Sequence, residues 1–246
     1  MVQTNVAPGV HRIEDAYTNW YLVEEDGRLT IVDAGVPSSW ESLQTAVGEI
    51  GRSLSDVEAL VLTHAHFDHI GMAERVRTQL DVPVYVHEND VPLTHHPLRY
   101  AYERHPFKYF ATQVNALPIV AAFVRARAFL PTPVGEVQRF TDGALDVPGS
   151  LRVVPTPGHT LGHVCFDLPG RDTVIAGDAV VTLNPYTGGR GPQIVARAAT
   201  ADSARNLASL DALAQTDAST VLTGHGEPWR GGAAEAARLA QAAGPS

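Results

Sequence analysis

Residues 63–69, with the sequence THAHFDH, hold the densest group of side chains able to do chemistry. The segment supplies three imidazoles and one carboxylate, and both kinds of group are suitable ligands for zinc. His64 and His66 are two residues apart in an extended loop, so both can point toward one metal ion. Asp68 and His69 follow where the chain turns into a helix, and they would face a second ion. The segment therefore predicts a centre for two metal ions.

Three further short motifs each place a ligand-type residue at the end of a predicted strand. PGHT at 157–160 contains a rigid turn that projects its histidine, Asp178 follows the apolar run TVIAG, and GHG at 224–226 follows VLT. Each motif alone is weak, because a histidine after a strand is more often a solvated loop residue. Together with residues 63–69 they are enough for two metal ions with positions left open for water. The seven candidate ligands are His64, His66, Asp68, His69, His159, Asp178 and His225.

The elements that must position these residues alternate between strands and helices, which favours α/β layers over an all-β sandwich. Residues 19–35 alternate around Asp26-Gly27, a pair that suits the tight turn of a β-hairpin. We also expect strands over 57–63, 83–88 and 219–224, with several more between 137 and 177. The expected helices are 38–50, 70–80, 202–214 and 233–243.

The segment 97–135 differs from the rest by its aromatic content and its apolar residues at helical spacing. Pro118 interrupts the pattern, which predicts two helices with the proline in the first turn of the second. The segment is either a helical hairpin packed on the core, or a lid or homodimer interface. As a lid it would use Phe107 and Phe110 to wall a pocket for an apolar part of the substrate. We expect residues 1–246 to form a single domain with this lid-like insertion.

Composition narrows the classes of function and partner. The chain has 246 residues, 44% of them hydrophobic, and a formal net charge of −9, which disfavours nucleic acid as a partner. Cys165 is the single cysteine, so no internal disulfide can form and a reducing compartment is favoured. The first 20 residues are not typical of a secretory signal, and no apolar run reaches the roughly 18 residues of a membrane span. We therefore expect a cytoplasmic protein that acts on a small molecule.

The motifs HAHFDH, PGHT, GD and GHG, in this order and spacing, resemble the motif set of the metallo-β-lactamase superfamily. The resemblance runs from the hairpin ending in Asp33 to His225, and it implies an α/β fold, the αββα four-layer sandwich. It also implies that Asp178 bridges two metal ions and that His163 is structural. The other implied ligands are His64, His66 and His159 on the first ion, with Asp68, His69 and His225 on the second.

Departures from individual branches of this superfamily narrow the expected activity. Asp178 stands where true β-lactamases lack an aspartate, which disfavours antibiotic hydrolysis. His66 stands where the di-iron flavoprotein oxygen reductases carry a carboxylate, which favours zinc and hydrolysis over redox iron. Val181 occupies the offset at which acyl-homoserine lactonases carry a tyrosine, and Tyr186 is the alternative. The Cys-Gly-[Lys/Arg]-Phe segment of glyoxalase II is absent, so the chain is most similar to the broad lactonase-like and glyoxalase-II-like group.

The expected activity is zinc-dependent hydrolysis of an ester, thioester or lactone by a hydroxide that bridges two zinc ions. Asp68 is the expected catalytic residue, because it can orient this hydroxide and accept its proton. Asp33 is either an outer hydrogen-bond partner that orients a ligand histidine or a plain turn residue. Tyr186 and Arg190 either contact the substrate or belong to an ordered loop.

Three other activities fit the same residues: an iron-dependent persulfide dioxygenase, a phosphodiesterase and a non-catalytic metal-binding protein. Iron and manganese are the alternatives to zinc. The remaining histidines have no motif support and are expected on the surface or behind the ligands. They are His11, His87, His95, His96 and His105.

Overall fold

The first strands of the chain form an antiparallel meander. The computed structural model describes the backbone of residues 1–246 and every side chain except those of residues 110 and 111. Strands β3 (Thr18–Glu25) and β4 (Arg28–Val32) form the predicted hairpin, and Glu25 lies opposite Arg28. Its turn residues, Asp26 and Gly27, have φ angles of 50° and 80°, as a primed turn requires. Strands β1 (Val2–Ala7) and β2 (Val10–Asp15), which the sequence analysis did not predict, extend the meander.

From β4 onward the same sheet is parallel, with the strand order β1-β2-β3-β4-β5-β6-β7. In a parallel sheet the carboxyl ends of neighbouring strands meet at one edge. Asp33 follows β4, His64 follows β5 and Asp90 follows β6, so this edge collects polar side chains. The strands of this parallel part are β5 (Val57–Val61), β6 (Val84–His87) and β7 (Gln138–Phe140). The helices between them are α1 (Ser39–Glu49), α2 (Ala73–Leu80) and α3 (Val91–His95).

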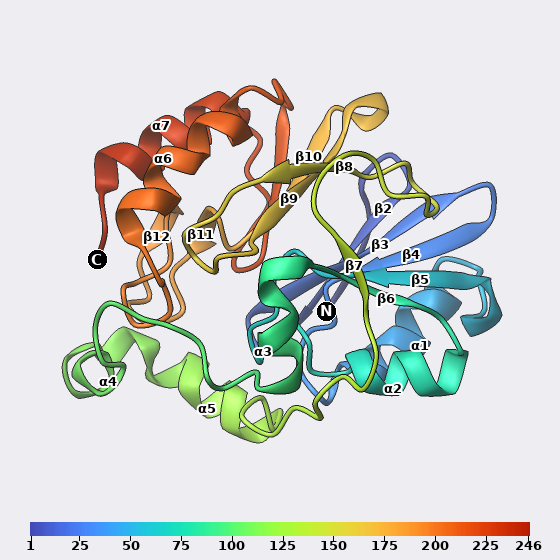
Figure 1. Ribbon diagram of the computed structural model, residues 1–246, viewed down its shortest axis with the longest axis horizontal. Helices are drawn as coiled ribbons and strands as arrows, with labels where there is room; N and C mark the ends of the chain where they lie inside the picture. The colour runs from blue at the N-terminus through green and yellow to red at the C-terminus, as the bar shows by residue number, and fades with distance from the viewer.

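A second sheet, in the order β13-β10-β9-β8, faces the first. Strands β10 and β13 are parallel, so they too end at a common edge. Figure 1 shows helices α6 and α7 over the outer face of this sheet, and β11 and β12 form a separate hairpin. The bounds are β8 (Arg152–Pro155), β9 (Val164–Leu168), β10 (Thr173–Gly177), β11 (Val181–Leu183), β12 (Arg190–Gln193), α6 (Ser203–Ala214), β13 (Thr220–Thr223) and α7 (Ala233–Ala243).

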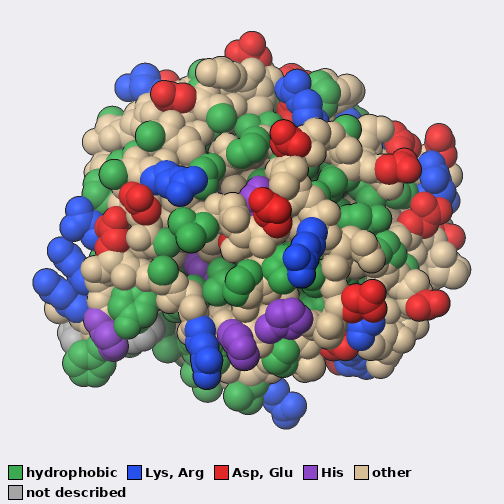
Figure 2. All heavy atoms as spheres, viewed as in Figure 1, with side chains coloured by type: hydrophobic (Ala, Val, Ile, Leu, Met, Phe, Trp, Pro, Cys, Tyr) green, Lys and Arg blue, Asp and Glu red, His purple; other side chains and the backbone are tan. Residues whose placement is uncertain are grey.

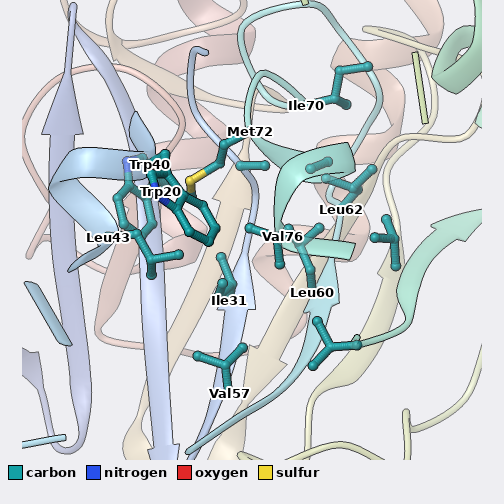
Figure 3. Close-up of a cluster of buried hydrophobic side chains, with 14 of the residues drawn as sticks. Trp20, Ile31, Trp40, Leu43, Val57, Leu60, Leu62, Ile70, Met72 and Val76 are labelled. Carbon is teal, nitrogen blue, oxygen red and sulfur yellow. The ribbon is translucent and has the colours of Figure 1, made fainter. Parts of the chain in front are cut away.

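Three layers of buried apolar side chains hold these elements together. The first layer lies between α1, α2 and the larger sheet, where Trp20, Trp40 and Leu43 lie together (Figure 3). The second joins the inner faces of the two sheets, and the third joins the smaller sheet to α6 and α7. Helix, sheet, sheet and helix therefore stack in that order, which confirms the αββα architecture expected from the sequence.

The segment 97–135 crosses the edge of this sandwich and contains α4 (Phe107–Thr112) and α5 (Leu117–Arg125). Pro118 lies in the first turn of α5, as predicted. The inner side of α5 packs on Phe67, whereas large apolar side chains of the segment are exposed on its outer side, where Figure 2 shows hydrophobic atoms over α4 and α5. Its role as a lid or an interface stays a prediction.

Among the described residues, no helix is long and apolar enough to cross a membrane.

Two glycines allow a matched test of the close packing beneath the site. A Cβ at Gly71 would lie 2.2 Å from the carbonyl carbon of Val36, whereas at Gly48, in α1, it meets no described atom within 4 Å. We expect Gly71→Ala to lower the free energy of unfolding by about 3 kcal/mol, because the added methyl group overpacks the interior. Gly48→Ala should raise the free energy of unfolding by up to about 1 kcal/mol, because alanine has the higher helix propensity. Urea unfolding measures both, and equal effects at the two positions would contradict the packing described here.

Candidate metal centre

All seven candidate ligands lie together at the edge where the strands of both sheets end. Residues 64–69 follow β5, His159 follows β8, Asp178 follows β10 and His225 follows β13. Each of the seven residues is between 0 and 6% exposed. Segments far apart in the sequence thus place five imidazoles and two carboxylates in one buried cluster.

The cluster divides into two groups of three joined by one carboxylate. The ligand atoms of one group lie within 4.8 Å of one another, and so do those of the other. Between the groups, Asp178 places Oδ1 3.6 Å from Nε2 of His69 and Oδ2 3.5 Å from Nε2 of His159. Its Oδ2 also lies 3.3 Å from Nε2 of His225. The groups are His64, His66 and His159, and Asp68, His69 and His225.

The inward-facing atoms of this cluster suit a cation. Among the side chains that the structure describes, Nε2 of four of these histidines is buried without a hydrogen-bond partner, as is Oδ1 of Asp178. A buried polar atom without a hydrogen-bond partner lowers the stability of the folded state by about 1–3 kcal/mol. Lone pairs of imidazole and carboxylate that converge on one space are the donor set that divalent transition metals prefer. The residues present therefore fit two metal ions. The four histidines are His64, His66, His69 and His159.

Hydrogen bonds to groups outside the cluster determine which ring nitrogen of His69 and of His225 faces it. Nδ1 of His69 lies 3.1 Å from Oδ2 of Asp33, and Nδ1 of His225 lies 2.7 Å from the carbonyl oxygen of Tyr17. Each oxygen is placed to accept a hydrogen bond from the Nδ1–H group, which leaves Nε2 directed inward. Asp33 is therefore an outer partner of a ligand histidine, the first of the two roles considered for it.

Thr63 extends the influence of Asp33 to a second histidine. The Thr63 hydroxyl donates to Oδ2 of Asp33 at 2.8 Å, so its oxygen is able to accept from Nδ1 of His64 at 3.0 Å. The backbone N–H of Thr63 donates to the other carboxylate oxygen at 2.8 Å. One carboxylate thus orients His69 directly and His64 through a hydroxyl, a role for Thr63 that the sequence analysis missed.

His163 holds the backbone of Asp178 in place from outside the cluster. Its Nε2 accepts a hydrogen bond from the backbone N–H of Asp178 at 3.0 Å, and its Nδ1 lies 2.8 Å from the Thr156 hydroxyl. Both ring nitrogens are therefore used within the protein, which agrees with the structural role implied for His163.

Asp90 is a buried carboxylate that the sequence analysis missed. Its Oδ2 accepts from the backbone N–H of Ala65 at 3.1 Å and from the Thr160 hydroxyl at 2.7 Å. Its Oδ1 accepts from the backbone N–H of Gly162 at 2.8 Å. Asp90 therefore ties the loop carrying His64 and His66 to the loop carrying His159. Its place just after the predicted strand 83–88, at the same sheet edge as the candidate ligands, was the available signal.

Burial and neighbouring charges divide the histidines into two electrostatic classes. Burial lowers the pKa of His66 and of His163 to about 3, and it lowers the pKa of His64 and of His159 well below the usual value. Burial also opposes the charge on His69, but the nearby carboxylates of Asp178, Asp68 and Asp33 outweigh it and raise its pKa to about 10.

The two carboxylates of the cluster also differ from each other. Burial raises the pKa of the Asp68 carboxyl. Burial would do the same at Asp178, but His225 and His69 outweigh it and hold the pKa of that carboxyl well below its usual range. Asp178 is therefore a permanent anion between the two groups of ligands, whereas Asp68 is the carboxylate better able to take up a proton.

The predicted substrate-contacting residues lie in different surroundings. The hydroxyl of Tyr186 lies 3.3 Å from that of Tyr100, whose ring centroid is 4.6 Å from that of His66. Arg190 is exposed at the start of β12, and Phe107 is 72% exposed on α4. The side chain of Phe110 lies outside the described residues. The substrate contacts of all four residues stay predictions.

The remaining histidines lie away from the seven ligands. His95, His96 and His105 are exposed, and His87 is half-buried. His11 is buried in β2, where its Nε2 lies 3.8 Å from Glu24, so its expected place on the surface or behind the ligands was wrong.

Removing the Asp90 carboxylate should loosen both ligand loops. We expect Asp90→Ala to lower metal affinity by about 10–100-fold, the usual cost of losing an outer partner of a metal site. Asp167 is also a buried aspartate, but it lies in β9 and pairs with Arg152 of the neighbouring edge strand β8. Asp167→Ala should therefore lower stability while metal affinity is kept. Competition with a chelator measures affinity, and an unchanged value in Asp90→Ala would rule out this role.

The stability of the metal-free protein should peak near pH 6.5. His64, His66, His159 and His163 stay neutral in the folded state but gain protons on unfolding below 6.5, so stability falls as the pH falls from 6.5 toward 5. His69 retains its proton in the folded state up to about pH 10, so its contribution is lost as the pH rises above 6.5. Urea unfolding in the presence of a chelator measures this profile. A midpoint that rises as the pH falls below 6.5 would contradict it.

Comparisons with known proteins agree with this architecture. The chain is 28% identical over 240 residues to the probable metallo-hydrolase YflN of Bacillus subtilis (strain 168), which covers 92% of this chain and 86% of YflN. The crystal structure of the metallo-beta-lactamase family protein TTHA1429 from Thermus thermophilus has a TM-score of 0.69 and 26% identity, over 96% of this chain and 79% of that chain.

A second solved structure is also similar to this chain. TTHA1623, described in a di-iron-bound form, has a TM-score of 0.59 and 28% identity, over 89% of this chain and 92% of that chain.

The family model described as the metallo-beta-lactamase superfamily matches residues 13–225, a range that includes all seven candidate ligands. The chain therefore belongs to the metallo-beta-lactamase superfamily.

Proposed function

We propose that this protein is a hydrolase that holds two zinc ions and cleaves an ester, thioester or lactone. The observation that carries the proposal is the pair of buried ligand groups joined by the Asp178 carboxylate. Two divalent cations held there would lower the pKa of a bound water to about 7 and polarise a substrate carbonyl. The similarity to a probable metallo-hydrolase supports hydrolysis as the reaction class.

The division of the ligands assigns a role to each residue. His64, His66 and His159 would hold one ion, and the group of Asp68, His69 and His225 would hold the other. Asp178 would bind both, because its two oxygens face histidines of different groups. Its low pKa keeps the carboxylate charged throughout the physiological range.

Asp68 is the proposed proton acceptor of the reaction. Its Oδ2 lies 3.4 Å from Nε2 of His225 and 3.5 Å from the Thr18 hydroxyl, at the inner edge of the cluster. Because burial raises its pKa, the Asp68 carboxylate is suited to take a proton at Oδ2 and to pass it to the leaving group. The Thr18 hydroxyl would help to hold that oxygen in place.

Zinc is favoured because five of the seven candidate ligands are imidazoles, which zinc binds well. Iron is the main alternative metal, since the related TTHA1623 has a di-iron-bound form. The negative net charge, together with the scarcity of Lys and Arg near the metal motifs, favours a carbonyl substrate over a phosphodiester.

The protein as purified should contain close to two transition-metal ions per chain, mostly zinc. It should hydrolyse at least one member of a panel of lactones, esters and thioesters faster than any phosphodiester. Asp178→Ala should lose one ion and at least about 100-fold in kcat/KM while staying folded, since a carboxylate that serves both ions is removed. Elemental analysis, circular dichroism and initial rates measure these outcomes.

The matched control for this experiment is Asp167→Ala, which removes a buried carboxylate outside the cluster. It should keep both ions and the wild-type kcat/KM. A single iron per chain with oxygen consumption would refute the hydrolase proposal and favour a dioxygenase. Full retention of both ions in Asp178→Ala would refute the bridging role.

A further inference from the structure

A cavity of about 240 Å³ opens directly beside the candidate ligands of the first metal ion. His66 and His159 line it, and its other lining residues include Leu93 of α3, Tyr100 and Leu161. We propose that this cavity binds an apolar group of the substrate that carries a carboxylate, and that the carboxylate pairs with Arg99 at the rim. The inference rests on the proposed function and specifies its substrate class.

The size of the cavity sets the size of the group that it takes. An apolar cavity of about 150 Å³ is enough to hold a benzene molecule. A cavity of about 240 Å³ therefore accommodates a phenyl ring or a short acyl chain. A longer chain would extend past the rim into solvent, so it would gain little further binding.

The walls are suited to an apolar group rather than a polar one. Leu93, Leu161 and the ring of Tyr100 present carbon atoms to the cavity. Asp90 also lines it, but its carboxylate oxygens already accept hydrogen bonds from Ala65, Thr160 and Gly162. The carboxylate therefore acts inside the protein, and it is not the group that would recognise the ligand.

Arg99 supplies the positive charge at the rim. Its side chain is exposed and lines the cavity, and it forms no ion pair with any residue that the structure describes. Its guanidinium is therefore available to a ligand carboxylate, the anion whose planar geometry it matches best. Since such a pair would be exposed to solvent, we expect a preference of about threefold to fivefold.

The position of the cavity also connects it to the reacting bond. His66 and His159 belong to the same ligand group, whereas Asp68, the proposed proton acceptor, belongs to the other. A group seated in the cavity would therefore place the atoms attached to it beside the first group of ligands. Tyr100 closes this side, with its ring beside that of His66 and its hydroxyl against Tyr186.

Binding of three carboxylic acids to the metal-loaded protein tests the proposal without relying on turnover. Acetate has no chain to place in the cavity, hexanoate has a short apolar chain, and adipate adds a second carboxylate at the far end of such a chain. By calorimetry, adipate should bind about threefold to fivefold more tightly than hexanoate, and Arg99→Ala should abolish this difference. Arg104→Ala is the matched control, because Arg104 is an exposed arginine of the same segment that does not line the cavity.

Filling the cavity tests its apolar walls separately. Leu161 is 53% exposed, so Leu161→Trp should fold and should weaken hexanoate binding at least about tenfold while acetate binding is unchanged. Leu93→Trp, at a second residue that lines the cavity, should have the same effect. Equal binding of hexanoate and adipate by the wild type would overturn the role of Arg99. Unchanged hexanoate binding in both tryptophan variants would overturn the cavity as the binding site.

Hydrolysis of the 4-nitrophenyl esters of hexanoate and adipate then separates this inference from the proposed function. If the acids bind as expected but neither these esters nor any thioester or lactone is cleaved, the hydrolase proposal fails and the cavity assignment stands. If the esters are cleaved equally well by the wild type, Arg99→Ala and Leu161→Trp, the hydrolase proposal stands and the cavity assignment fails.

Discussion

The Asp33 carboxylate is the contact on which the order of the metal centre depends. It follows β4 with a φ of 61°, a conformation that non-glycine residues seldom adopt, and it is almost fully buried. From there it accepts hydrogen bonds from the Thr63 backbone and hydroxyl and from His69. A buried carboxylate is costly unless its oxygens are satisfied, and here its partners are the groups that orient histidines of both ligand groups. These hydrogen bonds compensate for the strained backbone of Asp33.

Asp90 is a second buried carboxylate that holds loops of the candidate site in place. Asp90 joins the loops that follow β5 and β8, which belong to different sheets. Because both sheets end at the same edge, these short loops can be tied by single side chains instead of by extra elements of structure. The sandwich thus supplies the approximate positions of the ligands, and two buried carboxylates and His163 supply their orientation.

Much of the fold could be predicted from local pattern. The Asp26-Gly27 turn, helix 233–243 and the strands that end in ligands were all recognised, because turn chemistry and apolar periodicity are local. Helix α2 begins at Ala73 rather than at residue 70, and the backbone N–H groups of Gly71 and Met72 just before it donate to Gly35 and Ala34. Such tertiary bonds leave no trace in the sequence pattern, and the pairing of β1 with β2 was missed for a similar reason.

The candidate site shows the same division between local and tertiary information. The histidines of residues 63–69 are recognisable because their spacing is dense, and His159, Asp178 and His225 because each follows a strand. Thr63, Asp90 and Tyr100 act through contacts with distant parts of the chain, so residue type alone could not assign them. Phe107 illustrates the converse limit: helical spacing identifies an apolar face, but it does not say what that face meets.

Phe67 connects the metal centre mechanically to the segment 97–135. It stands between His66 and Asp68 in the sequence, yet its ring packs on Phe123 and Phe129, with centroid distances of 5.8 and 5.1 Å. The helical segment therefore cannot lift from the sandwich without uncovering a residue whose neighbours on both sides belong to the candidate ligand set. By thermodynamic reciprocity, an interaction that stabilises the present position of that loop also stabilises the packed position of the segment. Loosening the segment would therefore weaken the binding of any ion held by that loop.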